Sequence, residues 1–142
     1  MAKLTLQQAN KIIEGALAKA REMKIKPLGV VVLDESGHLK AAQREDAASM
    51  FRIEIATGKA WAAVGMGASS RALAARAKDN PNFFVTLAAT AGGKFLPQTG
   101  AVLIRNAAGE LLGAAGASGG AGEEDEAACK YGVEQAGLVA EV

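Results

Sequence analysis

Residues 28–44, LGVVVLDESGHLKAAQR, decide the fold, because two strand-like runs flank a turn. The continuous valine-rich run at 28–33 predicts a strand that is buried on both faces. The DESG segment at 34–37 has the residue types of a tight turn, and 39–44 is then the returning strand. The sequence therefore predicts a β-hairpin.

A second hairpin is predicted further along the chain. Residues 101–105 and 111–116 are apolar and flank the turn sequence NAAG at 106–109. Two hairpins with flanking helices favour an α+β fold with a central antiparallel sheet over a doubly wound parallel one. Residues 92–96 are expected to add an edge strand, because Pro97 cannot donate to a strand ladder.

Helices are expected between and around the hairpins, with a cap at each start. Thr5 is the predicted N-cap of the first helix, Asp46 or Ser49 of the second, and Ser69 or Ser70 of the third. The predicted helices span 6–23, from the second cap to about 64 (stopped by Gly65 and Gly67), 71–78 and 123–136, and the ambiguous segment 83–91 could be a short helix.

Composition limits the class of protein. The 142 residues fit one domain, 1–142, and half of them are hydrophobic, which argues against disorder. Because 16 basic and 15 acidic residues leave a net charge of +1 without a basic block, nucleic-acid binding is not expected. No stretch is long and apolar enough for a membrane span and no signal sequence is evident, so a cytoplasmic protein is expected. The single cysteine, Cys129, excludes an internal disulfide, and its apolar helical neighbours predict a packed side chain.

Several short segments resemble one widespread bacterial family. They are DxxGHLxAxxRxD at 34–46, IEIA at 53–56 followed by KA at 59–60, GG at 92–93 with Pro97, VxIR at 102–105, and SGG at 118–120 followed by DE at 125–126. The family contains a glycolate-operon protein, secreted haem-binding and haem-degrading proteins, and the C-terminal domain of a cobalamin adenosyltransferase. The resemblance implies a profilin-like α-β-α layered domain that assembles into a homo-oligomer.

His38 is the only histidine, and it is the candidate metal ligand and proton carrier. A neutral imidazole can ligate haem iron, and the same ring can transfer protons near neutral pH. The alternative is an exposed residue at the start of a strand.

Arg44 and Asp46 lie at the junction between the first hairpin and the next helix. Arg44 can hold a carboxylate or a haem propionate through two parallel hydrogen bonds. The alternative is structural: Arg44 pairs with Asp46, and Asp46 caps the helix.

Lys59 lies among alanines on the predicted second helix. A lysine in such surroundings can act as a base or bind an anion, so Lys59 is a candidate for catalysis and for ligand binding. The alternative is a lysine whose stem packs on the helix while its ammonium reaches water.

Ser118 and Gly119 open a glycine-rich turn before an acidic cluster at 123–126. Backbone N–H groups of such a turn can bind an anionic ligand, although the acids suit the positive end of a helix better. Asp125 and Glu126 would need burial and a partner to serve as acid-base groups near neutral pH.

Two functions stay open at this point. One is a protein that binds haem, a corrinoid or a related small ligand. The other is a cofactor-independent lyase or isomerase that acts on a small organic acid or carbonyl compound in a catabolic pathway, with Lys59 and His38 as its acid-base residues. The resemblance to a haem-binding family favours the first, and no motif selects the second.

Overall fold

The computed structural model describes residues 2–142, which form helices and strands in nearly the predicted order. The elements are α1 (Leu6–Glu22), β1 (Gly29–Asp34), β2 (Leu39–Arg44), α2 (Phe51–Met66), α3 (Ser70–Asp79), α4 (Pro81–Thr90), β3 (Ala101–Arg105), β4 (Leu111–Ser118), α5 (Gly122–Gln135) and β5 (Val139–Glu141).

The strands form one antiparallel sheet in the order β2-β1-β4-β3-β5. Both predicted hairpins are present, as β1–β2 and β3–β4. The hairpins are joined by β1 and β4, which pair from Gly29 opposite Ser118 to Asp34 opposite Gly113. This central pairing puts residues from both halves of the chain side by side.

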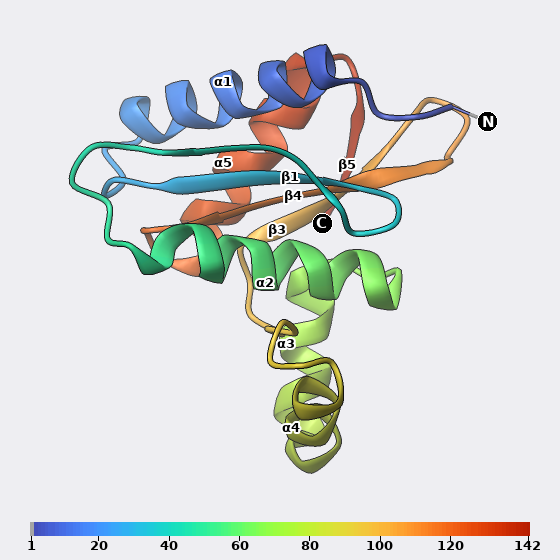
Figure 1. Cartoon of the computed structure of the whole chain (residues 1–142). Coiled ribbons are helices and arrows are strands. Elements are labelled where there is room, and N and C mark those ends of the chain that lie inside the picture. The colour runs from blue at the N-terminus through green and yellow to red at the C-terminus, as the bar shows by residue number, and fades with distance from the viewer. Residues whose placement is uncertain (1) are drawn as a thin grey trace.

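Helices cover both faces of the sheet, as Figure 1 shows: α1 and α5 pack on one face and α2 on the other. The predicted α-β-α layering around an antiparallel sheet is confirmed. In β1, Val30 and Val32 join the core under α1 and α5, whereas Val31 and Leu33 join the core under α2. Burial on both faces explains why this strand is apolar without alternation.

The first helix begins as predicted. Thr5 accepts a hydrogen bond from the N–H of Gln8, and the Gln8 side chain accepts one from the N–H of Thr5, which makes a capping box. Ser69 likewise caps α3. The prediction for α2 is wrong, because its N-cap is Met50 and neither Asp46 nor Ser49 caps it. The helix also continues through Gly65, and Gly67 ends it in a left-handed conformation with a φ of 62°.

One strand prediction is wrong, and one strand was missed. Residues 92–96 form a turn and an extended segment rather than an edge strand, because Gly92 and Gly93 have φ values of 71° and 79°. The edge next to β3 is instead covered by β5, which the sequence did not predict.

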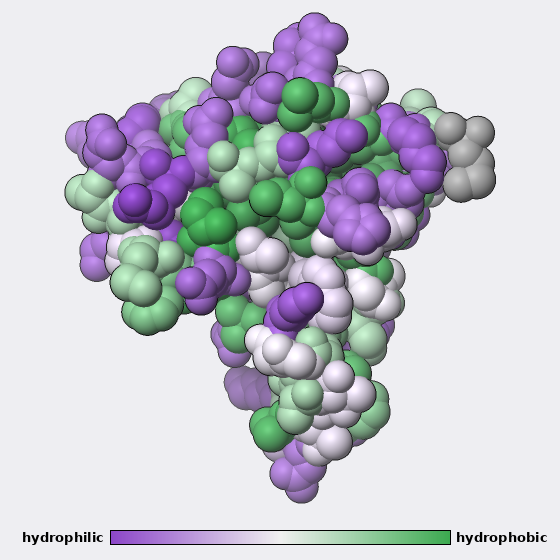
Figure 2. Space-filling model, in the orientation of Figure 1, coloured by the Kyte–Doolittle hydropathy of each residue, from purple (hydrophilic) through white to green (hydrophobic). Residues whose placement is uncertain are grey.

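A helical projection leaves the sheet beyond α2. In Figure 1, α3 and α4 extend away from the layered body, and in Figure 2 much of this projection is weakly polar or hydrophobic on the visible face. Its small core contains Ala62, Leu73, Phe84 and Phe95. Among residues 2–142, no helix has both the length and the apolar character needed to cross a membrane.

Candidate functional site

Two hollows lie side by side along α2. The first, the apolar hollow, has a volume of about 470 Å³, and the second, the polar hollow, about 410 Å³. Ile55 and Leu96 line both hollows and form their common wall. The apolar hollow is lined by Phe51, Ile53, Glu54, Ile55, Thr57, Gly58, Gly93, Lys94, Phe95 and Leu96. The polar hollow is lined by Arg52, Ile55, Lys59, Leu96, Gln98, Thr99, Ser118, Gly120, Gly122 and Glu123.

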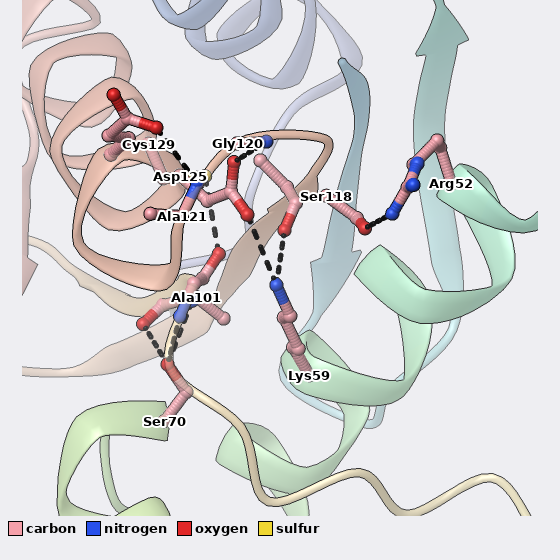
Figure 3. Close-up of polar contacts among 12 residues, drawn as sticks. Arg52, Lys59, Ser70, Ala101, Ser118, Gly120, Ala121, Asp125 and Cys129 are labelled. Atoms are coloured by element: carbon pink, nitrogen blue, oxygen red, sulfur yellow. Dashed lines mark hydrogen bonds and ion pairs between the residues drawn. The ribbon is translucent and has the colours of Figure 1, made fainter. Parts of the chain in front are cut away.

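Lys59 forms a buried ion pair at the base of the polar hollow (Figure 3). Its Nζ donates to the carbonyl oxygen of Ala117 at 3.0 Å and to Oδ2 of Asp125 at 3.2 Å. The other carboxylate oxygen, Oδ1, accepts the N–H of Gly120 at 2.9 Å. Only 6% of Lys59 and 1% of Asp125 are exposed, so the two charges are largely shielded from water, and Lys59 alone of the pair lines the hollow.

Burial raises the pKa of the Asp125 carboxyl above its ordinary value, although the Lys59 ammonium and the Gly120 N–H oppose the shift. This carboxyl therefore has the burial and the partner that an acid-base group needs near neutral pH. The same helix carries Cys129, which is fully buried. Burial also raises the pKa of its thiol, so Cys129 is a packed side chain rather than a nucleophile.

In the turn from β4 to α5, backbone N–H groups donate hydrogen bonds to carboxylates of the helix that follows. The N–H of Gly120 donates to Asp125, and that of Ala121 donates to Oε1 of Glu124. Gly119 has a φ of 152°, and a Cβ at this position would lie 2.3 Å from the carbonyl oxygen of Pro27. The turn is therefore fixed in shape, with these two donors satisfied inside the chain.

Ser118 and Arg52 also line the polar hollow, and Figure 3 shows that their side chains meet. Nη1 of Arg52 donates to Oγ of Ser118 at 3.2 Å. The two residues meet because a Cβ at Gly29 would be only 2.9 Å from Arg52, so the glycine lets the start of α2 approach the sheet at the strand end where Ser118 lies.

A family model described as "Haem degrading protein HbpS-like" matches residues 4–134. The chain belongs to this family. The match confirms the resemblance seen in the sequence. No curated protein matches the chain.

Solved structures agree with this placement. A double mutant of HbpS from Streptomyces reticuli is 27% identical, with 94% of this chain and 87% of that chain covered and a TM-score of 0.81. The PduOC:heme complex is 22% identical, with 99% and 100% covered and a TM-score of 0.86. Klebsiella pneumoniae protein ORFY is 21% identical, with 96% and 93% covered and a TM-score of 0.86. Because the last two structures are only 22% and 21% identical to this chain, their likeness shows the fold alone.

Two of the site residues predicted from this HbpS-like sequence line the polar hollow, and a third lies in the turn beside it. Lys59 and Ser118 line it, and Gly119 shapes the turn beside it. Arg44 and Asp46 line a separate hollow of about 430 Å³ together with Arg21, Pro27 and Glu45. Nη1 of Arg44 donates to the carbonyl oxygen of Ala48 at 2.6 Å, and within residues 2–142 no hydrogen bond or ion pair joins Arg44 to Asp46.

His38 lies at the other end of the first hairpin. Its side chain is 81% exposed, and its Nδ1 is 3.9 Å from Oδ1 of Asp34. Strand β1 separates this turn from Gly29, and its five steps span about 16 Å. Among residues 2–142, no group of three or more histidine, cysteine or carboxylate side chains could hold a metal ion. The predicted role of His38 as an iron ligand stays a prediction.

The sequence analysis did not predict that Arg52, Gln98 and Thr99 line the polar hollow. It also did not predict that Lys59 is the partner of Asp125. Lys59 and Asp125 are 66 residues apart, and nothing in their local sequence links them. Arg52 had one usable signal: it precedes the apolar IEIA segment at the start of the helix that carries Lys59.

Proposed function

We propose that this protein binds a haem-related small ligand, whose flat apolar part enters the apolar hollow. The observation that carries the proposal is the lining of that hollow: Phe51, Ile53, Phe95 and Leu96 supply hydrophobic surface. Its volume of about 470 Å³ lies within the usual range of small-molecule sites, about 300–1,000 Å³. Membership of the HbpS-like family supports haem as the ligand to test first.

The apolar hollow has side chains that can pack on a tetrapyrrole ring but none that ligates haem iron. Its rim offers one cation, Lys94, and one carboxylate, Glu54, both exposed. None of its lining residues is a histidine, cysteine, methionine or tyrosine, the side chains that ligate haem iron. This chain's contribution is to seat the ring and exclude water, while bound haem would supply the redox chemistry of its iron. His38 does not line this hollow, and its neighbour Gly37 lies against Trp61. Its role as an iron ligand therefore stays a prediction from the sequence, which the His38→Ala variant tests.

An absorbance titration with haemin tests the proposal. Binding is expected to sharpen and shift the Soret band to saturation. Phe51→Ser should weaken binding about tenfold, because it removes apolar wall that a ligand would cover. Phe51 is 55% exposed, so the fold should tolerate the change. Val85→Ser on α4, at a residue that is 70% exposed and lies outside the hollow, is the matched control.

Two results would count against this reading. An unchanged Soret band at saturating protein would refute haem binding. Equal affinity of Phe51→Ser and Val85→Ser would place the ligand elsewhere. His38→Ala should retain the fold, and a changed Soret position in this variant would assign the iron ligand to His38.

We also propose that the protein is a closed homo-oligomer. Strand β2 lies at the edge of the sheet with mostly exposed side chains, and Leu39 on it and Met50 after it are 63% and 71% exposed. Exposed strand edges and apolar side chains of this kind favour association between copies of a chain. Light scattering coupled to size exclusion should give a multiple of 14.4 kDa, and a monomer at micromolar concentration would contradict the proposal.

A further inference from the structure

We propose that the polar hollow is a carboxylate-binding site built on Arg52, Lys59 and Ser118. The inference concerns a second site, next to the proposed haem-related site and separated from it by Ile55 and Leu96. The apolar hollow has hydrophobic walls, whereas the polar hollow concentrates cations and hydroxyl groups.

The first support is the hydrogen-bonding capacity that the two cations retain. Arg52 has five N–H donors, and its contact within residues 2–142 is the neutral hydroxyl of Ser118 rather than a carboxylate. Lys59 has three N–H donors, of which two are used, by Ala117 and Asp125. Both side chains line the polar hollow, so each can direct a charged donor toward a ligand there.

The second support is the balance of charge and hydrogen-bonding groups around the hollow. Its lining carries two cations and one carboxylate, that of Glu123, which is exposed at the start of α5. Asp125 pairs with Lys59 and offsets its charge, so Arg52 is the cation whose charge remains for a ligand, and the Lys59 ammonium adds a hydrogen-bond donor. Gln98 and Thr99 add neutral polar side chains opposite the helix. A single carboxylate would meet a guanidinium, an ammonium and a hydroxyl here, a set that recognises this group through charge-assisted hydrogen bonds.

The third support is rigidity of the surrounding backbone. Oγ of Ser70 accepts the N–H groups of Gly100 and Ala101 and donates to the carbonyl oxygen of Ala101 (Figure 3). A Cβ at Gly100 would lie 2.5 Å from Nζ of Lys59, so the glycine makes room for the ammonium. The donors are therefore held in place before a ligand arrives, which lowers the entropic cost of binding.

The carboxylate can come from two sources. One is a propionate of a tetrapyrrole whose ring lies across the shared wall in the apolar hollow. The other is a free small organic acid. Titration with acetate, followed by the backbone amide shifts of Gly120 and Gly122, detects the shared chemistry directly. Saturable shifts with a millimolar dissociation constant are expected in the wild-type protein.

Variants assign the binding to the hollow. Arg52→Gln keeps a donor for Ser118 but removes the charge, so acetate affinity should fall about tenfold or more. Arg76→Gln, an exposed arginine on α3, is the matched control and should bind as the wild type does. Absent or non-saturating shifts, or equal affinity of the two variants, would overturn the proposal.

The source is then decided with haemin and its dimethyl ester. A tenfold weaker affinity for the ester, together with competition by acetate, identifies a propionate as the occupant. Saturable acetate binding with equal affinity for both porphyrins identifies a free acid. Acetate binding without any Soret change would refute the haem-related function and leave the carboxylate site standing.

Discussion

Replacing Lys59 by methionine tests whether the buried ion pair supports the fold. Lys59→Met keeps most of the side-chain volume but removes the donor that lies 3.2 Å from Oδ2 of Asp125. Asp125 would then be a carboxylate that is 1% exposed, with the N–H of Gly120 as its remaining donor. Breaking a buried pair in this way costs about 3–5 kcal/mol of unfolding free energy, because one buried charge loses its partner.

The pH dependence of the loss identifies its cause. Burial already raises the pKa of Asp125, and removal of Lys59 takes away an interaction that lowers it. A carboxyl whose pKa is higher in the folded than in the unfolded state binds its proton more tightly when folded. Its contribution to stability is therefore fully present below the unfolded pKa and is lost as the pH rises through the folded pKa. The deficit of Lys59→Met relative to wild type should be smaller at about pH 5 than at about pH 7.5.

Urea unfolding followed by the fluorescence of Trp61, the only tryptophan, measures both quantities. The double variant Lys59→Met, Asp125→Asn should recover much of the stability and lose the extra pH dependence, since an amide still accepts the Gly120 N–H. Lys130→Met, at an exposed position on α5, is the control. A loss below about 1 kcal/mol at neutral pH, or a deficit that grows on acidification, would refute the reasoning.

Two further predictions concern packing and backbone satisfaction. Gly132→Ala should lower the free energy of unfolding by about 1–3 kcal/mol, because the new Cβ would lie 2.2 Å from the carbonyl oxygen of Ile12 where α5 packs on α1. Gly65→Ala has no atom within 4 Å of the new Cβ and should instead stabilise α2 by about 0.5–1 kcal/mol. Equal effects of the two variants in thermal melts would contradict this account. Ser70→Ala should cost about 2–4 kcal/mol, because it leaves two buried N–H groups without their acceptor, and a change within experimental error in urea unfolding would show that they find another partner.

The sequence predicts most of the fold because the decisive signals are local. The valine run of β1, the two turns and the capping box at Thr5 each depend on residues within a few positions of one another. The failures have the same origin. A three-residue strand such as β5 is too short to show a periodic pattern, and its pairing with β3 is a long-range contact. At 92–96, Pro97 and the neighbouring apolar residues resembled an edge strand, but two glycines with positive φ turn the chain instead.

The candidate site was predicted only in part, for the same physical reason. Lys59 was a candidate because of its alanine-rich surroundings, Ser118 because of its glycine-rich turn, and both because their segments resemble a family. Neither hollow has a sequence pattern of its own. The polar hollow exists because α2 and the turn before α5 come together at the end of β4. Asp125 is buried and paired because α2 brings Lys59 to it. No local feature of 123–126 therefore distinguishes Asp125 from the exposed Glu123.

The pairing of β1 with β4 joins the two halves of the chain, which could also exist as two complementary fragments. A cut in the segment between α4 and β3 would leave one hairpin on each fragment, with β1 and β4 as open edges. Each fragment alone would expose apolar surface on both sides of its hairpin, so mutual docking is the way for either to bury it. Lys59 would belong to one fragment and Asp125 to the other. The ion pair at the polar hollow would then form only when the two pieces reassemble in register.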